Sequence, residues 1–486
     1  MTNGRMQTER TAVGRWLTQI LPTVLALGAV VWFYQWTVRT SGGFNPPGEE
    51  DYYHFLVRGW QQGHLYLAKE PRPEMLALAD PWDPVRNAAW RMGDASYFRG
   101  HHYLYFGAAP ALLVMWPYGV ITGQPMGTTT AVFVFCTLGY LAMAGGWLAV
   151  RRRYFPDSAW WVAPAGVLVL GFGSQVLALA RRPLVWELPI AAGFAFLMLA
   201  VVAAGLALHA RRPARWMALS GLMLGCAVAS RPTTVLAAAM FVPVLWYVWR
   251  TAPGQWWRCA LGTAATLGLC IGAVLAHNAA RFGNPLEFGQ NYQLSVIYES
   301  KMRHFSPSYV LHNLFIYFGN APSWSRAFPF LTSKVIGGGP PGYLDICVEG
   351  ICGVAVTFPG LWLAVAAPLV WWRREAPEMV RLRALVAVIA VVMATQTAVI
   401  LGYFVAMVRY AADFGPALAV LAVLGLLGVE RWVRQRRGAG VVNALMILAV
   451  VATVVAGVLV SFDYHHQMLK TLWPDGWRNL ESWFKR

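Results

Sequence analysis

The sequence predicts an all-α polytopic membrane protein with about 11 transmembrane helices, and two observations support this fold class. Apolar runs of about 20 residues recur along the chain of 486 residues, and this length crosses the hydrocarbon core of a bilayer. Only 13% of the residues are charged, and the mean hydropathy is +0.47. These values exclude an ordinary soluble domain.

The net charge of +17 suggests nucleic acid as a partner, but the placement of the basic residues excludes it. They form short clusters between the apolar runs, which is the positive-inside pattern of a membrane protein. We therefore expect no nucleic-acid partner. The first apolar run, Trp16 to Trp36, is long enough to span and has no small-residue cleavage site, so we expect no cleavable signal peptide.

The apolar runs also give the order of the spans. We expect them near 16–38, 127–150, 159–178, 187–208, 214–230, 233–249, 259–280, 351–372, 384–406, 411–430 and 440–460. Arg5, Arg10 and Arg15 place the amino end inside, and every dense arginine cluster then falls in an inner loop. The whole chain, 1–486, is expected to form one membrane domain.

This topology requires that the apolar stretch Tyr103 to Thr122 does not cross the membrane. The stretch contains two prolines and several glycines, so we expect a helix that lies along the outer face. The first outside loop then covers 40–126 and contains amphipathic surface helices, the second covers 281–350, and a tail covers 461–486. A first loop of this length with its own helices is usually functional.

The first loop begins with three consecutive acids, Glu49, Glu50 and Asp51. Adjacent carboxylates repel one another, so at least one of them should hold its proton more tightly than a free side chain. Such a carboxylate is a candidate general base or metal ligand. The alternative is a helix start, because acids favour a helix N-terminus and Gly48 fits a cap.

Three arginine turns are expected at the outer ends of spans: Arg181-Arg182, Arg231 and Arg409. The planar guanidinium binds two phosphate oxygens at once, so each is a candidate contact for an anionic group at headgroup level. The alternative for any one of them is snorkelling toward ordinary lipid phosphate.

Two further acids accompany these arginines. Glu187 begins a span on the outer side, where it could favour the helix N-terminus, pair with Arg181 or Arg182, or converge on the acids of the first loop. Asp413 follows Arg409 by four residues, so we expect it to orient that guanidinium on a shared helix face.

Other residue types give weaker indications. The first loop contains His54, His64, His101 and His102, but their spacing matches no zinc motif. The chain has no phosphate-binding glycine loop and no dinucleotide fingerprint, which argues against a soluble nucleotide donor. Cys347 and Cys352 lie outside, where a disulfide is chemically allowed.

Several segments resemble the GT-C glycosyltransferases, polytopic enzymes that use lipid-linked sugars and include protein O-mannosyltransferases and the aminoarabinose transferase of lipid A. The segments are GHLYL, SYFRGHHYLYFGAAPALLVMWPY, ARRPLVWELPIAAG, SRPTTVL, RFGNPLEFGQNYQL and RYAADFGPAL. They are similar to an uncharacterised bacterial subgroup and cover nearly the whole chain. In this family an Asp-Glu pair after the first span begins a surface helix, and here Glu49 and Glu50 stand at that place.

The resemblance implies a function on the outer face of a bacterial inner membrane. A polyprenyl-phosphate sugar would enter from the bilayer, and its sugar would pass to a hydroxyl of a glycan, lipid or protein acceptor, with inversion. The implied donor-site residues are Arg409, Arg231, Arg181, Arg182, Arg281, Glu187, Tyr53 and His54. One acid of Glu49 to Asp51 would be the base.

The same resemblance bears on cofactors and on rival functions. No cofactor is required by the sequence, although a divalent metal, Mg²⁺ or Mn²⁺, is compatible with the acidic run. Membrane lipids are the other expected partners. A transporter or flippase of a lipid-linked precursor is the main alternative, but repeated halves and spans broken near the midplane are not evident. A non-catalytic envelope assembly protein is the third.

Overall fold

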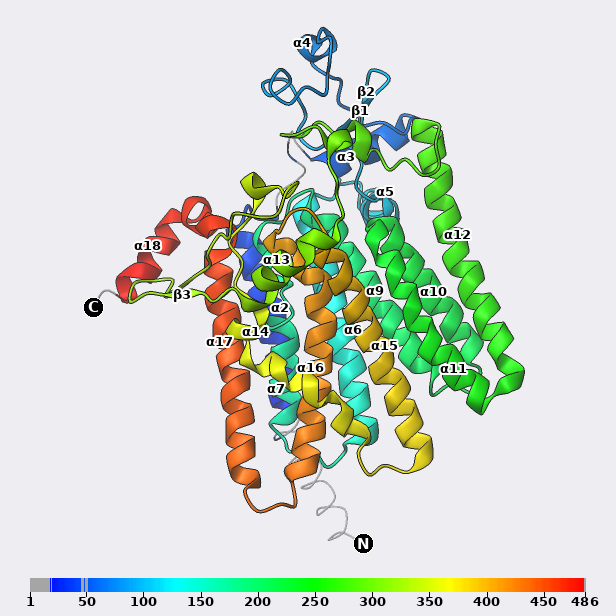
Figure 1. Cartoon of the computed structure of the whole chain (residues 1–486), viewed down its shortest axis with the longest axis vertical. Helices are drawn as coiled ribbons and strands as arrows, with labels where there is room; N and C mark the ends of the chain where they lie inside the picture. Colours follow the sequence, from blue (N-terminus) through cyan, green and yellow to red (C-terminus); the bar gives the residue numbers. More distant parts are fainter. Residues whose placement is uncertain (1–17, 19, 45–47, 49–50, 485–486) are drawn as a thin grey trace.

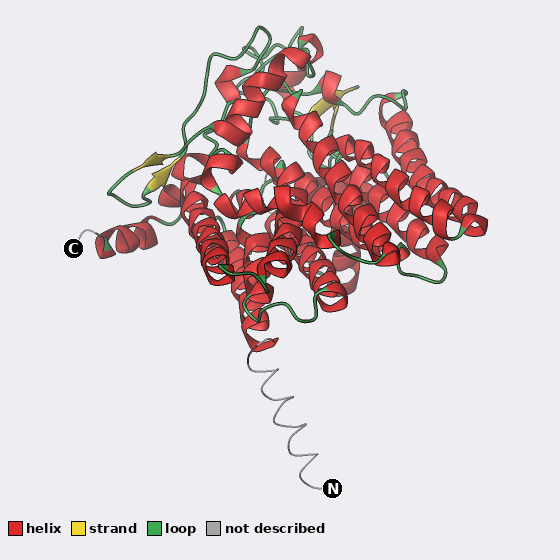
Figure 2. Cartoon of the chain, turned by 60° about the horizontal axis from the view of Figure 1, so that its bottom comes forward, coloured by secondary structure: helices red, strands yellow, loops and turns green. Residues whose placement is uncertain are grey.

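The computed structural model describes residues 18, 20–44, 48 and 51–484, so Glu49 and Glu50 lie outside the described residues. Helices form nearly all of the regular structure, and the described strands form only two short antiparallel pairs (Figure 2). The predicted all-α class is confirmed. Figure 1 shows the long helices side by side, with a layer that contains α3, α4, β1 and β2 above them.

Eight described helices are long and apolar enough to cross a membrane, by length and composition. They are α2 (Leu21–Thr40), α6 (Thr128–Tyr154), α9 (Glu187–Ala207), η3 with α11 (Pro232–Met240 and Phe241–Thr251), η4 with α12 (Pro253–Gln255 and Trp256–Phe282), α15 (Ala376–Leu401), η11 with α16 (Val408–Tyr410 and Ala411–Val433) and α17 (Ala439–Leu472). Each coincides with one of the expected spans.

The other three expected spans are also helical, but two of them are broken. The run at 214–230 forms α10 (Pro213–Ser230). The run at 159–178 forms α7 (Val162–Phe172) and α8 (Leu177–Arg181), separated by a turn in which Gln175 has a φ of 66°. The run at 351–372 forms α14 (Val354–Thr357) and the 3₁₀ helix η10 (Pro359–Trp371), which contains Pro368.

The apolar stretch Tyr103 to Thr122 forms no long helix, as predicted. It contains the end of β2 (His101–Tyr103), then η2 (Ala111–Met115) and α5 (Trp116–Thr122). The last two make a helix over 111–122, shorter than the roughly 20 residues of a straight span.

The first outer loop packs against the start of the second, whereas the later β3–β4 pair lies beside α17 and α18 (Figure 1). The first contains α3 (Tyr52–Gln61), α4 (Pro73–Leu76) and the hairpin of β1 (Ser96–Phe98) with β2; the second contains η5 (Gln290–Tyr292), η6 (Glu299–Lys301), η7 (Pro307–Tyr309), α13 (Val310–Leu314), η8 (Phe315–Gly319), β3 (Ser323–Trp324), β4 (Leu331–Thr332) and η9 (Asp345–Cys347). Ser96 bridges to Gln293, and Met75, Tyr97 and Leu294 form a small core between the loops.

The described part of the expected tail, 461–484, is helical on both sides of a break. Helix α17 extends to Leu472, with a break at Tyr464–Gln467 where three residues have positive φ, and α18 (Pro474–Trp483) follows. His465, at φ 54°, is one of these residues. The break turns its side chain back toward the bundle, where it is buried.

The arginine clusters gather at the end of the bundle away from the outer loops. Arg374 donates to the carbonyl of Tyr154, and Arg431 donates to that of Trp372, so loops that follow different spans meet there. We call this end the basic face, and the end with the two loops the outer face.

Candidate functional site

Five charged or titratable side chains meet beneath the outer layer and form what we call the charge cluster. Its members are Arg182, Glu187, Glu349, Arg409 and His465. They come from the turn between α8 and α9, the start of α9, the second outer loop, η11 and the break in α17. Buried charges are costly unless they are paired, so the acidic and basic members of the cluster must pair with one another.

Glu187 is the first residue of α9 and is fully buried. A carboxylate at this position is favoured by the N-terminal end of the helix dipole. Its Oε1 accepts a hydrogen bond from Nε of Arg182 at 3.0 Å and lies 3.7 Å from Nη1 of Arg409. Its Oε2 has no partner among the described residues.

Glu349 holds the other side of the cluster. Its Oε1 lies 3.0 Å from Nη1 of Arg182 and 3.3 Å from Nδ1 of His465, and its Oε2 accepts from the backbone N–H of Val408 at 2.8 Å. Burial raises the pKa of Glu349, but the hydrogen bond from His465 and the charges of His465, Arg182 and Arg409 outweigh it and hold this pKa well below the usual range. Glu349 is therefore ionised at neutral pH.

Arg409 differs from Arg182 in how its guanidinium is held. Nη1 of Arg409 lies 3.7 Å from Glu187 and 3.9 Å from Glu349, distances that are longer than a hydrogen bond. Within the described part of the chain, no side chain accepts a hydrogen bond from it. Its donors are therefore free for a ligand, whereas Nε and Nη1 of Arg182 are held by the two glutamates and its Nη2 alone lacks a partner among the described residues.

Arg231 lies beside the cluster and is paired separately. Its Nη2 donates to Oδ2 of Asp413 at 2.6 Å. Asp413 was expected to orient Arg409, but Arg409 lies in the 3₁₀ turn η11, so the regular i,i+4 relation to α16 does not hold. The guanidinium carbons of Arg231 and Arg409 each lie 5.2 Å from the centroid of the Tyr410 ring, so both cations contact one aromatic ring.

A cavity of about 230 Å³, which we call the arginine cavity, opens onto these two guanidiniums. Its polar and aromatic lining includes Arg231, Arg409, Tyr105, Trp186, Tyr403 and Tyr410. At its edge, the indole N–H of Trp186 donates to Asp94 at 2.6 Å, and Gln293 donates to the other oxygen of Asp94 at 2.7 Å. Asp94 is thus an additional acid beside the cavity.

A larger cavity of about 580 Å³, the apolar groove, adjoins the arginine cavity. Much of its wall is apolar and comes from α3, η2, α5, α10 and α12, including Trp60, Leu112, Trp116, Ala273 and Val274. The two cavities share wall residues: Tyr105, Phe106, Gly107, Pro232 and Phe288. An apolar chain and a polar head group of one ligand could therefore occupy adjoining spaces.

Gly107 brings this shared wall into position. A side chain at Gly107 would overlap the backbone oxygens of Ala229 and Ser230, so only glycine permits the first loop to approach the end of α10 this closely. The carbonyl of Gly107 accepts a hydrogen bond from the hydroxyl of Tyr53 at 3.1 Å, which ties the wall to α3.

Asp51, the described member of the acidic run, caps two helices. One oxygen, Oδ1, accepts from the backbone N–H of His54 and the hydroxyl of Thr128, and Oδ2 accepts from the backbone N–H of Thr128. These bonds satisfy N-terminal donors of α3 and α6. The cap alternative from the sequence thus describes Asp51, which is the residue directly before α3.

The other predicted residues lie at three different places. Tyr53 is buried behind the groove. The ring of His54 is tilted against that of Phe55. Burial is the main cause that lowers the pKa of His54. Arg181 is fully buried and donates to the carbonyl of Ser461 and the hydroxyl of Thr40, so it joins α8, α17 and α2 outside the charge cluster.

Arg281 lies in the wall of the apolar groove near the end of α12. Its Nη2 donates to the side chain of Asn278 at 2.7 Å, and its guanidinium lies over the ring of Phe282. Its Nε and the Nε2 of His277 have no partner in the part of the chain that the structure describes. The groove thus has a polar edge at its outer end.

Two expectations on other chemistry can be compared with the structure. No group of three or more His, Cys, Asp or Glu suited to a metal is found among residues 18, 20–44, 48 and 51–484. All six cysteines are free, so Cys347 and Cys352 form no disulfide.

Sequence reasoning missed Glu349 and His465. Glu349 is separated from Arg182 and from His465 by more than a hundred residues, and no motif surrounds it. The only sequence indication is that an acid stands directly before the apolar run at 351–372. His465 reaches the cluster only because α17 breaks at that residue.

The fold and the site together describe a polytopic membrane protein in which a charge cluster and an apolar groove meet at one end of a helical bundle. No family model and no curated protein matches the sequence. Among solved structures, the chain is similar to ArnT from Cupriavidus metallidurans bound to undecaprenyl phosphate, with 13% identity and a TM-score of 0.46 over 92% of this chain and 77% of ArnT.

The chain is also similar to the oligosaccharyltransferase of Archaeoglobus fulgidus, with 12% identity and a TM-score of 0.48 over 90% of this chain. It spans about half, 56%, of that protein. A second structure, AglB from the same organism with an inhibitory peptide and a dolichol-phosphate, gives 12% identity and a TM-score of 0.46. These proteins are GT-C glycosyltransferases, the family that the sequence resembles. With TM-scores below 0.5, the alignments assign neither residue roles nor a function to this chain.

Proposed function

We propose that the protein transfers a sugar from a polyprenyl-phosphate-linked donor to an acceptor hydroxyl at the outer face. The single observation that supports this most is the shared wall of the apolar groove and the arginine cavity. A prenyl chain in the groove brings its phosphate to the arginine cavity, where Arg231 and Arg409 line the wall. A water-soluble substrate would gain nothing from the groove.

Arg409 and Arg231 are the proposed phosphate contacts. When the bond between the anomeric carbon and the phosphate oxygen breaks, negative charge grows on the departing phosphate. Guanidinium groups held in place beforehand stabilise this charge without reorganisation. Arg182, fixed between Glu187 and Glu349, keeps the surrounding carboxylates from pairing more tightly with Arg409.

The acceptor hydroxyl attacks the anomeric carbon as this bond breaks, and its proton passes to a carboxylate, so the anomeric configuration inverts. We assign the base to the run of Glu49, Glu50 and Asp51. Both oxygens of Asp51 already accept hydrogen bonds, which favours Glu49 or Glu50 within the run. Asp94, beside the arginine cavity, is the rival acid that the structure adds, although each of its oxygens also accepts one hydrogen bond, from Trp186 and from Gln293.

The test follows radiolabelled sugar from a polyprenyl-phosphate donor to cell-envelope acceptors with the purified protein in nanodiscs. Glu49→Gln, Glu50→Gln, Asp51→Asn and Asp94→Asn are compared with the unchanged chain. We expect at least one amide of the acidic run to abolish transfer. Full activity in all three would overturn the assignment of the base, and loss only in Asp94→Asn would move it to Asp94. A lipid that crosses the bilayer uncleaved would instead identify a flippase.

The groove has its own test, which uses two exposed alanines of α12. Ala273 lines the groove and Ala264 does not. We expect Ala273→Phe to raise KM for a long-chain donor but not for a donor with a short, water-soluble chain, while Ala264→Phe changes neither. An equal effect on both donors would contradict the role of the groove.

Orientation, metal and substrates are further parts of the proposal. We place the basic face in the cytoplasm and the site at the periplasmic face of a bacterial inner membrane. A C-terminal alkaline phosphatase fusion should then be active.

A divalent cation, Mg²⁺ or Mn²⁺, would bind the acidic run, and a chelator should then reduce transfer. The sugar is a hexose or pentose, and the acceptor is a glycan, lipid or protein.

A further inference from the structure

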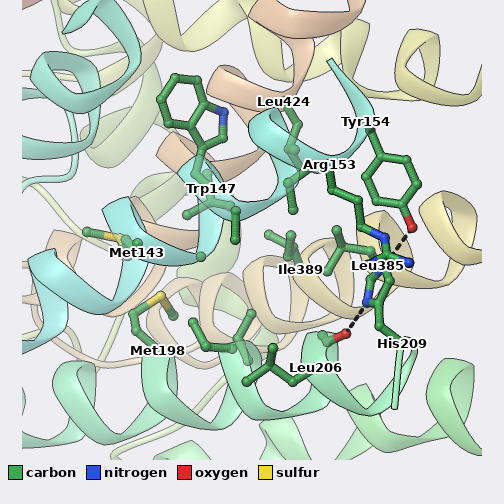
Figure 3. Close-up of a pocket in the computed structure, with 18 of the residues that line it drawn as sticks. Met143, Trp147, Arg153, Tyr154, Met198, Leu206, His209, Leu385, Ile389 and Leu424 are labelled. Atoms are coloured by element: carbon green, nitrogen blue, oxygen red, sulfur yellow. Dashed lines mark hydrogen bonds between the residues drawn. The ribbon is translucent and has the colours of Figure 1, made fainter. Parts of the chain in front are cut away.

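A further cavity shares no lining residue with the apolar groove or the arginine cavity. Figure 3 shows this inner cavity, of about 670 Å³, between α6, α9, α15 and α16. Its apolar wall includes Met143, Trp147, Met198, Leu385, Ile389 and Leu424. Helices α6 and α9 both begin at the outer face, and the residues that line the cavity lie near their other ends. The cavity is therefore in the half of the bundle next to the basic face. Its volume falls within the roughly 300–1,000 Å³ of a typical small-molecule site.

Glycines shape this space, and Gly145 is the one that opens it, because a Cβ at Gly146 would meet Val202 at 3.0 Å and a Cβ at Gly205 would meet Leu385 at 3.4 Å. Gly145 and Gly146 are adjacent in the middle of α6, and Gly205 lies opposite on α9. A side chain at Gly145 would meet nothing within 4 Å, so it would project into open space.

The cavity is charged only where it reaches the basic face. Arg152 and Arg153 line this end, and both are exposed. Tyr154 and His209 share a hydrogen bond of 2.6 Å beside them, and Figure 3 shows Arg153 next to this pair while Met143 and Met198 lie toward the other end. The cavity thus combines an apolar body with a cationic rim.

This arrangement matches an amphiphile with a long apolar chain and an anionic head. Water would find few polar partners in the apolar body. A peptide helix would be too wide for a cavity of this volume, because a helix with its side chains is about 10 Å across. Basic pockets between transmembrane helices near the cytoplasmic face are suited to anionic lipid head groups.

We propose that the inner cavity binds one anionic phospholipid, with an acyl chain between α6 and α9 and the phosphate at Arg152 and Arg153. This site is separate from the donor groove and does not depend on the proposed transferase activity. Its occupant would be drawn from the leaflet at the basic face and would fill the gap that the glycines leave.

Native mass spectrometry of the full chain in detergent, with phosphatidylglycerol or phosphatidylcholine added, tests the proposal. We expect one tightly retained phosphatidylglycerol in the unchanged chain. Gly145→Leu should remove it, whereas Gly268→Leu should not, because Gly268 is equally open but lies on α12 outside the cavity. Equal retention in Gly145→Leu and the unchanged chain would overturn the proposal.

The head-group contact is tested in a separate experiment. Arg152→Gln with Arg153→Gln should abolish the preference for phosphatidylglycerol over phosphatidylcholine. Arg258→Gln, an exposed arginine at the same face but outside the cavity, should keep it. A preference unchanged in the double variant would refute the assigned head-group site. Ala273→Phe changes the outer groove and not the inner cavity. If the bound lipid were lost only in that variant, the lipid would belong to the donor site, and this result would also contradict the proposal.

Discussion

Arg409 stands out at the scale of single residues because it is buried in a polar cluster and yet keeps its donors free. Arg182 is bound by two carboxylates at 3.0 Å, and Arg231 by one at 2.6 Å. The ion-pair distances of Arg409, 3.7 and 3.9 Å, leave its hydrogen-bond geometry unsatisfied. Such an incompletely bound guanidinium is suited to meet an incoming anion.

We predict that Arg409→Gln lowers kcat by about 100- to 1,000-fold, the range for removal of one charge-stabilising donor from a transition state. Arg409→Lys should restore part of the loss, because lysine retains the charge but not the planar fork. Steady-state transfer kinetics would measure both. Arg478→Gln, at an exposed position of α18, is the matched control. A glutamine variant with an unchanged kcat would show that Arg409 does not stabilise the leaving group.

The sequence could predict part of this cluster. Arg182, Arg409 and Glu187 are charges at the outer ends of apolar runs, where burial is costly, so their positions alone identify candidates. Glu349 and His465 could not be found in this way. Their encounter depends on a turn with positive φ at His465, and no local pattern in the apolar run before it predicts that the helix breaks there.

At the scale of elements, the lengths of the apolar runs predicted where helices form but not how regular they are. Every expected span is helical, because any chain segment in a bilayer must satisfy its own backbone hydrogen bonds. The irregular 3₁₀ helix η10, with Pro359 and Pro368, could not be inferred from hydropathy, which does not distinguish α from 3₁₀ geometry. Its neighbour α16 packs closely against it.

The junction of the first loop with α10 gives a prediction about Gly107. Gly107→Ala would collide with the backbone oxygens of Ala229 and Ser230, so the shared wall of the two cavities must move. We expect KM for the lipid donor to rise several-fold. Gly119→Ala, in α5 of the same loop, meets its nearest atom at 3.8 Å and should leave KM unchanged. Equal kinetics for the two variants would contradict a positioning role for Gly107.

The β1–β2 hairpin gives a prediction about pH. His102 is buried with Nδ1 3.4 Å from the carbonyl of Lys69, and burial lowers its pKa to about 4. The unfolded value is about 6.5, so the folded state binds this proton less readily. The stabilising contribution of the neutral ring is therefore complete above about pH 6.5 and is lost as the pH falls toward 4.

Thermal unfolding between pH 7 and 4 would measure this effect. We expect His102→Phe to flatten the decline of the unfolding midpoint over that range. His466→Asn, which changes an exposed histidine in the break of α17, should leave the decline as it is. The interpretation fails if the two variants follow the same pH curve.

At the scale of the whole molecule, polar groups concentrate at the two ends of the helical bundle. The outer face contains the charge cluster and the arginine cavity, and the basic face contains the arginine clusters and the rim of the inner cavity. The distribution of arginines in the sequence was sufficient to predict that the clusters share one face. It could not predict the two large cavities, which depend on helix packing.

A ligand that joins the outer loops to the bundle should stabilise the entire fold. We predict that polyprenyl phosphate raises the midpoint of thermal unfolding of the unchanged chain, since a ligand at 100 times its Kd adds about 2.7 kcal/mol of stability. Arg231→Gln with Arg409→Gln should remove the increase, while Arg434→Gln at the basic face should retain it. A similar increase in all three proteins would indicate non-specific lipid binding.

The apolar groove, open along α10 and α12, has a consequence for how the reaction rate is controlled. The proposed lipid-linked donor, entering through it, would not leave the bilayer, so its effective concentration would be a mole fraction in the membrane rather than a molarity in solution. Dilution of the donor with inert phospholipid should slow turnover even when the total amount of donor in the assay is constant. Competition among enzymes for the prenyl carrier would then be set by two-dimensional diffusion and by membrane composition.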